Sequence, residues 1–346
     1  GLHDTRCNCL GYTTYGKKRI RCWKRSGHGT LGLAEAEQRS CNPYFMKIAN
    51  ILGPEKMVST FKLLGLGQQT GIRLPKESSG IVPGSPEWRR RSRRNNITPA
   101  LNGMLSLGQG DSEASPLQLA TLVSAVANGG KIYKPRIVRE VSHPDLGIQI
   151  ANRPKLRVDL IKEGIQPAHM ATIRDGMYRA AHKLGGTARR ATPDDIKIGA
   201  KTGTAQTSDL GIRTHVAWTV AFAPYDDPRY VVVVAVKRGG SGGKVAGPLV
   251  KLILTGLFAQ ENGLELPLSK QVPYIGNTDL ISEISLPDDN PLAAAFAADG
   301  ETGDEASAIV IIKPEPEETT PLPKPTIRAE IDRRGSVIPR AIPISE

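Results

Sequence analysis

Three consecutive segments between residues 196 and 238 have the composition of β-strands, and they constrain the fold more than any other part of the chain. They are "IKIGAKTGTAQ" (196–206), "THVAWTVAFAP" (214–224) and "RYVVVVAVKR" (229–238). The links between them, "TSDLGIR" and "YDDP", are short and rich in turn residues, so an antiparallel meander is the simplest arrangement. The apolar run "GPLVKLILTGLF" then predicts a helix after the last strand.

Two further helices are indicated by their end signals. In "SPLQLATLVSAVANGG", Ser115 is the expected N-cap, Pro116 stands at the first helical position, Gln118 closes a capping box and Gly129 stops the helix. A second helix is expected in "SCNPYFMKIANILG", ending at Gly53.

Composition sets the class of protein and of partner. With 346 residues, of which 39% are hydrophobic and 23% charged, the chain can bury a core the size of one large or two small domains. Its formal charge of +12 suits an anionic partner such as nucleic acid, a membrane surface or an acidic polymer. The longest strand-like apolar run is Val231–Val236, so we expect no segment that spans a bilayer. Because the chain opens without methionine or a signal-peptide pattern, we interpret it as a fragment or processed product.

Composition and apolar patterning divide the chain into two parts. Residues 1–265 carry periodic apolar patterning, whereas residues 266–346 fill with Pro, Glu and Asp and are expected to be mostly disordered. Within this tail, "ASAIVIIK" (306–313) could add an edge strand, but we favour a solvated linker there.

The first strand carries the polar group "KTGT" at Lys201, Thr202, Gly203 and Thr204. A lysine at a sheet edge gives a fixed positive charge, glycine allows close approach of a ligand, and threonine hydroxyls can bind a carboxylate or carbonyl. This combination suits an acyl-transfer cleft. An exposed strand with a solvated lysine explains "KTG" about equally well when the tripeptide is taken alone.

Ser40 and Asn42 form a second motif, Ser-x-Asn, far upstream of Lys-Thr-Gly, and this pair is typical of serine acyl-enzymes. With these motifs the chain resembles the transpeptidase domain of class B penicillin-binding proteins, closest to the elongation-type penicillin-binding protein 2. The collinear matches are "RCWKRSGHG", "SCNPYF", "GLGQQTGIRLP", "LGQGDSEASPLQLA", "NGG", "KTGTAQ" and "HVAWTVAFAPYDDPRYVVVV", and with their flanks they span about residues 7–258.

The resemblance implies an α/β (α+β) fold, an antiparallel sheet flanked by helices with an active-site cleft, and peptidoglycan cross-linking through a serine acyl-enzyme. Carried onto this chain, it implies that Ser40 relays a proton, Asn42 holds the donor amide and Lys201 stabilises charge near Ser40. Thr202 and Thr204 would bind the substrate carboxylate, and the Thr204 N–H would form half of an oxyanion hole.

The resemblance also implies partners and a location. The substrates would be peptidoglycan stem peptides and lipid-linked precursors, β-lactams would bind the same site, and a membrane glycosyltransferase of the elongation machinery would be a partner. The expected location is the periplasmic face of the bacterial inner membrane, with the anchor absent from this chain. A D,D-carboxypeptidase or β-lactamase-like hydrolase, and a non-catalytic penicillin-fold module stabilised by zinc, are the alternatives.

One part of the family pattern is missing before the Ser-x-Asn motif. The only serine ahead of Ser40 is Ser26, which is followed by Gly-His-Gly, so no Ser-x-x-Lys precedes the motif. The chain is therefore expected to be truncated at its N-terminus, to lack the nucleophile and to be inactive alone. We also expect its sheet to be incomplete, with an uncovered edge.

All four cysteines lie within the first 41 residues, with a histidine among them. Three thiolates and one imidazole make a closed tetrahedral zinc site, and we favour Cys7, Cys22, His28 and Cys41 as its ligands. Cys9 is the alternative to Cys7. Members of the resembled family carry a zinc site at these positions, beside Ser-x-Asn. Two disulfides remain open because this chemistry occurs outside the cytoplasm, and free thiols are the third possibility.

Two other stretches are weaker signals. "WRRRSRR" (88–94) has the charge and the tryptophan of a nucleic-acid patch, but anionic glycan, lipid headgroups or a solvated face fit better, and we expect no nucleic-acid partner. "RGGSGGK" (238–244) does not have phosphate-loop spacing and is interpreted as a turn beside the cleft. We expect Trp23 and Trp218 to pack in the core or the cleft wall.

Overall fold

The fold is described from a computed structural model of the chain. The structure describes residues 4–143, 147–209, 212–264, 308–312, 328–331 and 337–340. Most of the 266–346 tail that we expected to be disordered lies outside these residues, so that expectation stays a prediction.

The helices are α1 (Leu33–Arg39), α2 (Asn42–Leu52), α3 (Pro54–Leu63), α4 (Pro86–Ser92), α5 (Pro99–Leu105), α6 (Pro116–Ala127), α7 (Pro167–His182) and α8 (Gly247–Glu261), with a 3₁₀ turn η2 (Arg189–Ala191) and a π-helical turn η3 (Gly242–Ala246). The strands are β1 (Cys7–Cys9), β2 (Tyr12–Tyr15), β3 (Lys18–Arg21), β4 (Gly29–Leu31), β5 (Lys131–Lys134), β6 (Glu140–His143), β7 (Gly147–Ala151), β8 (Lys155–Asp159), β9 (Gly199–Asp209), β10 (Ile212–Ala223), β11 (Tyr230–Val236), β12 (Ala308–Ile312), β13 (Arg328–Ile331) and β14 (Val337–Arg340).

The predicted meander is present. β9, β10 and β11 pair antiparallel in chain order, with Lys201 opposite Val220 in one pair and Val220 opposite Val233 in the other. The helix expected after the last strand is α8. The mixed helical and antiparallel architecture that the resemblance implied is therefore confirmed.

The edge of β11 is covered by a strand from the tail. β12 pairs antiparallel with β11, so the main sheet has the order β12-β11-β10-β9. Our preference for a solvated linker at 306–313 is therefore wrong, and the β11 edge of the described sheet is paired. The physical reason is that β11 is buried along its whole length and its backbone groups need partners, which a β-rich segment can supply. β13 and β14 form a separate hairpin within residues 315–346.

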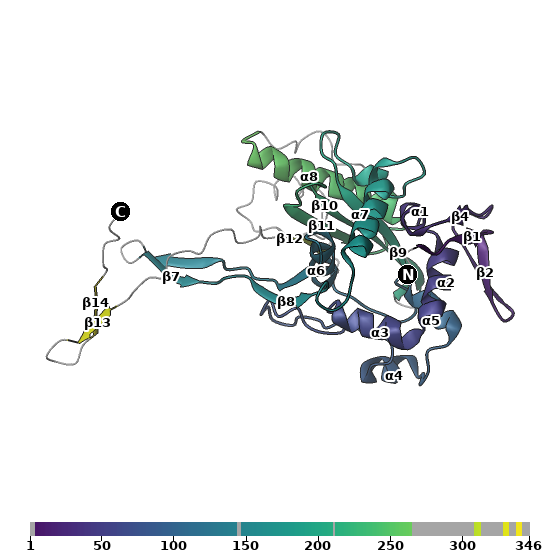
Figure 1. Ribbon diagram of the computed structural model, residues 1–346, viewed down its shortest axis with the longest axis horizontal. Coiled ribbons are helices and arrows are strands. Elements are labelled where there is room, and N and C mark those ends of the chain that lie inside the picture. The colour runs from purple at the N-terminus through teal and green to yellow at the C-terminus, as the bar shows by residue number, and fades with distance from the viewer. Residues whose placement is uncertain are drawn as a thin grey trace. The chain divides into compact units, whose positions relative to one another are not determined.

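The sheet has a hydrophobic layer on each face, with α8 and α6 on opposite sides (Figure 1). Alternate valines of β11 explain this, because Val232 and Val234 pack with α8 while Val231 and Val233 pack with α6. The helical stretch 242–261 is long and apolar enough to cross a membrane by length and composition. Its buried side chains Val250, Leu254 and Phe258 belong to the hydrophobic core on one face of the sheet.

Helix α6 begins as its sequence predicts. The Ser115 hydroxyl accepts from the Gln118 N–H and the Gln118 side chain accepts from the Ser115 N–H, which is the expected capping box. Gln118 is also buried and donates to the carbonyls of Gln68 and Ser79, so one side chain ties the helix start to two loops. Gly129 follows the C-cap at a positive φ of 82°.

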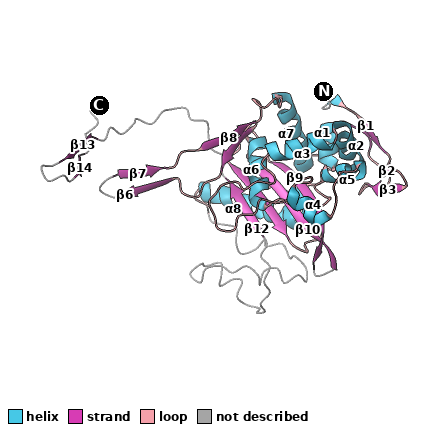
Figure 2. Cartoon of the chain, turned by 90° about the horizontal axis from the view of Figure 1, so that it is seen from below, coloured by secondary structure: helices cyan, strands magenta, loops and turns pink. Residues whose placement is uncertain are grey.

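The N-terminal region folds as two small antiparallel ribbons beside helices α1 and α2 (Figure 2). β1 pairs with β4, and β2 pairs with β3 in a hairpin. Glycine is required where the turns cross: a Cβ on Gly27 would lie 2.1 Å from the carbonyl oxygen of Cys9, and one on Gly11 would lie 2.1 Å from that of Arg25. This crossing sets β1 against the turn that carries His28.

Candidate active site and metal centre

The junction between α1 and α2 fixes the position of Ser40. Ser40 caps the C-terminus of α1 in the left-handed conformation, with φ 48° and ψ 55°. A non-glycine residue in this region is held there by its surroundings. The next residue, Cys41, is the N-cap of α2 and is fully buried, so the short loop is fixed on both sides.

The Lys-Thr-Gly strand meets Ser40 across 161 positions of sequence. The Lys201 ammonium donates to Ser40 Oγ at 2.7 Å and to the Thr202 carbonyl at 2.7 Å. The Thr187 hydroxyl lies 3.3 Å from Ser40 Oγ. The structure therefore brings together two of the predicted residues and adds a third hydroxyl.

Burial shifts the pKa values of Lys201 and its acidic neighbour Glu37. Burial lowers the pKa of Lys201 from its ordinary value, while the carboxylate of Glu37 acts in the opposite direction. Burial also raises the pKa of Glu37, with Lys201 opposing it. Ser40 is thus hydrogen-bonded to the Lys201 amino group, which loses its proton more readily than that of a solvated lysine.

The second half of the strand is organised by turn η3. The Thr204 hydroxyl accepts from the Gly242 N–H at 3.3 Å. A Cβ on Gly242 would lie 2.2 Å from the Gly203 carbonyl oxygen and 2.3 Å from that of Trp218. We expected the glycine of Lys-Thr-Gly to admit a ligand; here the chain's own Gly242 makes the close approach to Gly203.

Asn42 is held at the edge of this group. Its side-chain amide donates to the Arg21 carbonyl at 3.2 Å. In the part of the chain that the structure describes, that amide has no hydrogen bond to Ser40 or Lys201. The indole N–H of Trp23 donates to the Arg39 carbonyl at 2.7 Å, and the residue is 57% exposed, so Trp23 lies on the surface near Ser40 rather than in the core. Trp218 packs against the core as expected.

Sequence reasoning gave no site role to Thr187 or Glu37, although the stretch "GGTARR" (185–190) resembles a family loop that precedes the Lys-Thr-Gly strand, with a plain surface turn as the equal alternative. Thr187 lies in the "GGTARR" loop, and its N–H bonds to the Gln38 carbonyl at 3.3 Å while the Gln38 side chain donates to the Leu184 carbonyl at 2.8 Å. These two bonds fasten the loop to α1, next to Ser40. Neither residue belongs to the Ser-x-Asn or Lys-Thr-Gly motif, so their places beside Ser40 and Lys201 depend on the packing of α1 against α7 and its following loop.

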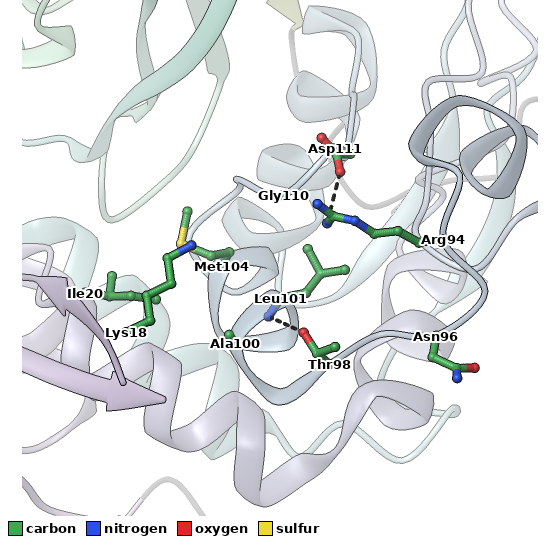
Figure 3. Close-up of a pocket in the computed structure, with 10 residues that line it drawn as sticks. All are labelled: Lys18, Ile20, Arg94, Asn96, Thr98, Ala100, Leu101, Met104, Gly110 and Asp111. Atoms are coloured by element: carbon green, nitrogen blue, oxygen red, sulfur yellow. Dashed lines mark hydrogen bonds and ion pairs between the residues drawn. The ribbon is translucent and has the colours of Figure 1, made fainter. Parts of the chain in front are cut away.

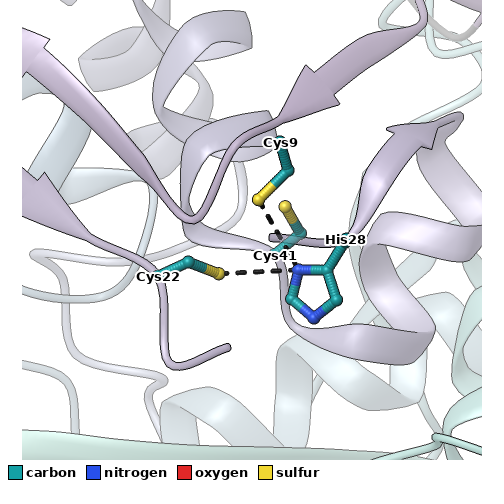
Figure 4. A group of neighbouring side chains, drawn as sticks. All are labelled: Cys9, Cys22, His28 and Cys41. Atoms are coloured by element: carbon teal, nitrogen blue, oxygen red, sulfur yellow. Dashed lines mark hydrogen bonds between the residues drawn. The ribbon is translucent and has the colours of Figure 1, made fainter. Parts of the chain in front are cut away.

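A group of sulphur and imidazole ligands lies directly behind Ser40. The ligand atoms of Cys9, Cys22, His28 and Cys41 are all within 4.8 Å of one another. The His28 Nδ1 is 3.7 Å from the Cys9 Sγ and 3.6 Å from the Cys22 Sγ (Figure 4). All four cysteines of the chain are free thiols in this structure.

Our preference for Cys7 as a ligand is corrected to Cys9. In the β1–β4 pairing Cys9 stands opposite Gly29, next to His28, whereas Cys7 stands opposite Leu31. Two strand residues span about 6.6 Å, so the Cys7 thiol is buried elsewhere on the same face and remains outside the group.

The donor atoms of the group fit a zinc ion. A hydrogen bond from the Cys41 thiol lowers the pKa of Cys22 to about 5, and the same contact raises the pKa of Cys41. Burial lowers the pKa of His28 and favours the neutral ring. Nδ1 is the His28 nitrogen that faces the thiols, and the buried Nε2 has no hydrogen-bond partner among the described residues. Three sulphurs and one neutral imidazole are a closed zinc ligand set.

Comparison with known proteins identifies the family. Residues 2–255 match the transpeptidase domain of penicillin-binding proteins. The chain belongs to this family. The curated relatives and solved structures described next place it with the class B transpeptidases of the penicillin-binding protein 2 type.

Among the curated relatives of this chain, stage V sporulation protein D of Bacillus subtilis is 35% identical over 251 residues, covering 70% of this chain and 36% of that protein. The peptidoglycan D,D-transpeptidase MrdA of Haemophilus influenzae is 29% identical over 250 residues, covering 68% of this chain and 38% of that protein. The chain therefore spans less than half the length of these relatives.

Solved penicillin-binding protein 2 structures share the fold. The Pseudomonas aeruginosa protein in complex with WCK 5153 has a TM-score of 0.63 at 29% identity, covering 78% of this chain and 57% of that one. The Helicobacter pylori protein in complex with MreC has a TM-score of 0.62 at 29% identity, covering 75% of this chain and 46% of that one.

The printed sequence has two Ser-x-x-Lys matches after the Ser-x-Asn motif, and neither behaves as the family nucleophile. Ser59–Lys62 lies on α3, where the Ser59 hydroxyl donates to the Lys56 carbonyl on an exposed surface. Ser241–Lys244 opens η3, where Lys244 is exposed. In the part of the chain that the structure describes, neither serine is hydrogen-bonded to Lys201 or Ser40.

The arginine-rich stretch at α4 is not a stacking surface for bases. Trp88 is fully buried, and three of the arginines are paired with acids at Glu87, Asp111 and Glu113. Aromatic interleaving therefore gives no support to nucleic-acid binding.

A cavity of about 410 Å³ lies beside α5 and contains none of the predicted site residues. Figure 3 shows Arg94 reaching across it to Asp111, at 3.4 Å, with Lys18 on the opposite wall. Its wall includes Gly110 and Asp111, which belong to the same loop as Gln109.

Proposed function

We propose that this chain forms the Ser-x-Asn and Lys-Thr-Gly side of the active site of a peptidoglycan D,D-transpeptidase. The observation that carries the proposal is the 2.7 Å contact between the Lys201 ammonium and Ser40 Oγ, which joins the two motifs in one group. The family and the named function of its relatives support the reaction class.

In the proposed mechanism the attacking serine comes from a Ser-x-x-Lys segment outside these 346 residues. It adds to the carbonyl of the penultimate D-alanine of a stem peptide, the terminal D-alanine leaves, and an amine of a second stem peptide takes the acyl group. Ser40 relays a proton: it gives its hydroxyl proton to the leaving amine and takes up the proton released by the attacking serine, while Lys201 holds its hydroxyl and supplies positive charge beside it. The Thr204 N–H supplies half of an oxyanion hole, and Thr202 and Thr204 bind the substrate carboxylate.

We also propose that Cys9, Cys22, His28 and Cys41 hold a structural zinc ion. When bound, the ion contributes no chemistry to acyl transfer and fixes ligand geometry. Because Cys41 lies between Ser40 and Asn42, these four residues hold the Ser-x-Asn loop against the β1–β4 ribbon. We also propose that lipid-linked precursors are substrates and that β-lactams bind the same site. A membrane glycosyltransferase is the proposed partner, and the periplasmic face of the inner membrane is the proposed location.

Covalent labelling with a fluorescent penicillin tests the proposed function. The 346-residue chain is expected to remain unlabelled, and a version extended upstream to include a Ser-x-x-Lys segment is expected to be labelled. In the extended protein, Lys201→Ala should slow labelling roughly a hundredfold, the typical effect of losing one preorganised charge-stabilising group. Ser59→Ala is the matched control and should label at the wild-type rate. Labelling of the 346-residue chain, or an unaltered rate in Lys201→Ala, would contradict the proposal.

A further inference from the structure

The outer edge of β9 is the place where the main sheet ends on the active-site side. β9 is the terminal strand of the order β12-β11-β10-β9, and β10 occupies one of its edges. In an antiparallel pair, alternate residues direct their N–H and C=O groups away from the partner strand. Thr204 and Gln206 are two positions apart, so their outward groups lie on the same free edge.

The side chain of Gln109 already fills this edge. Its Nε2 donates to the Thr204 carbonyl at 3.0 Å, and its Oε1 accepts from the Gln206 N–H at 3.3 Å. One carboxamide therefore makes the two bonds that the N–H and C=O groups of an added strand would make. Thr204 and Gln206 are exposed and Gln109 is partly buried, so the two bonds add to partial burial in holding the carboxamide there.

The loop that carries Gln109 is fixed through its backbone. The Gln109 N–H bonds to the Met104 carbonyl at 3.1 Å, and the Gln109 carbonyl accepts from the Ser112 hydroxyl at 3.4 Å. Its neighbours Gly108 and Gly110 have φ values of 70° and 85°, a conformation that glycine adopts without strain. Both bonds from Gln109 to β9 are made by its carboxamide, so a change of side-chain rotamer would break them without moving the loop backbone.

We propose that Gln109 is a built-in competitor for the edge of β9, and that an extended peptide substrate must displace its carboxamide in order to pair with Thr204 and Gln206. The proposal rests on the proposed function, because it assumes that β9 binds a stem peptide. Strand addition at a sheet edge is a general mode of peptide recognition. Gln109 then acts as a specificity residue: ligands that pair with both β9 groups replace its bonds, and ligands without a donor and an acceptor do not.

Binding of diacetyl-L-lysyl-D-alanyl-D-alanine to the 346-residue chain, followed by NMR, tests this inference. Gln109→Ala should bind the peptide roughly tenfold to thirtyfold more tightly than the wild type, because two neutral hydrogen bonds no longer compete. Gln109→Glu keeps the acceptor for the Gln206 N–H but loses the donor to the Thr204 carbonyl, so a smaller gain is expected. Gln69→Ala is the control, since the Gln69 side chain donates to the Glu77 carbonyl elsewhere in the fold.

Hydrogen exchange at the Gln206 amide gives a second readout that needs no ligand. Without peptide, exchange should be about tenfold faster in Gln109→Ala than in the wild type, because the amide loses its acceptor. Adding the peptide should restore protection. A purely structural role for Gln109 predicts weaker peptide binding in Gln109→Ala, and equal or weaker binding overturns the inference. The proposed function is judged separately by penicillin labelling of the extended protein, so failure of one is distinguishable from failure of the other.

Discussion

At the scale of single residues, the site depends on a few side chains whose surroundings alter their charge. Lys201 and Glu37 are both half-buried, and each is shifted by burial away from its charged form while the other's charge opposes that shift. The carbons of the Glu37 side chain lie against α7, where a Cβ on Gly176 would be only 2.6 Å from the Glu37 Cβ. The glycine at that position is what allows α1 to bring this carboxylate near Lys201.

Replacement of Glu37 tests this electrostatic arrangement. Burial raises the folded-state pKa of Glu37 above its ordinary value of 4.5, so the folded state binds a proton that the unfolded chain has released. Its contribution to stability is therefore complete below about pH 4.5 and is lost as the pH rises toward the folded pKa. We expect Glu37→Gln to remove this decline in the free energy of unfolding, as measured by urea unfolding at several pH values.

The control for this measurement is Glu55→Gln, on the exposed surface of α3. It should keep the pH dependence of the wild type. A slope above pH 4.5 that is the same in Glu37→Gln and in the wild type would show that the Glu37 carboxyl is not perturbed in the folded state.

The metal proposal makes a prediction about two cysteines on one strand. Cys9→Ser should reduce bound zinc from one ion per chain toward none after dialysis, because it removes one of four ligands, whereas Cys7→Ser should retain the ion. Metal analysis measures this directly. Thiol counting with a chelator should find all four cysteines reactive, and fewer thiols under non-reducing conditions would favour disulfides instead.

At the scale of secondary-structure elements, the site is assembled where β9, η3 and the α1–α2 junction meet. The closest approach is that of η3, whose Gly242 lies over Gly203 and leaves no room for a side chain. This contact and the bond from the Gly242 N–H to the Thr204 hydroxyl fix the half of β9 that carries the predicted substrate threonines. The position of β9 is therefore set by η3, a turn that comes two strands later in the chain.

Substitution of this glycine tests the role of η3. Gly242→Ala should lower the free energy of unfolding by about 1–3 kcal/mol, because the new methyl group would displace backbone atoms in a tightly packed region. Gly247→Ala is the matched control five positions along, where a Cβ would meet ordinary contacts at 3.5 Å at the start of α8. Urea unfolding should separate the two, and equal midpoints would contradict the close packing of η3 on β9.

At the scale of the whole molecule, the order of the main sheet is set by a segment from the tail. β12 supplies the outer neighbour of β11, from Val231 opposite Ile312 to Ala235 opposite Ala308. β11 is buried along its whole length. Loss of β12 would leave its outward N–H and C=O groups unpaired, and such an edge can pair with a strand of another molecule.

Truncation tests the part played by β12. A chain ending at residue 305 should self-associate more strongly than the full chain, because the β11 edge is then open for pairing. A chain ending at residue 314 keeps β12 and removes only the second compact unit, so it should behave like the full chain. Sedimentation velocity over a range of concentrations measures the difference. If both truncations remain monomeric to the same degree, β12 does not protect the sheet.

The sequence by itself determined the local structure and the chemistry of the motifs. The β9–β11 meander, the capping box of α6 and the stop of α2 at Gly53 follow from residue pattern and turn chemistry, which act over a few positions. The pairing of Ser40 with Lys201 was accessible through the family resemblance, because both motifs are short and ordered along the chain.

Only the tertiary structure decided which partners actually meet. The choice of Cys9 over Cys7 follows from the register of β1 against β4, and Glu37, Thr187 and Gln109 gain their roles from elements that are distant in sequence. The tail strand β12 is a similar case, since its neighbour is a strand far upstream. Strand register and helix packing depend on the total apolar surface buried between elements that are distant in sequence. A local pattern of residues does not determine that total.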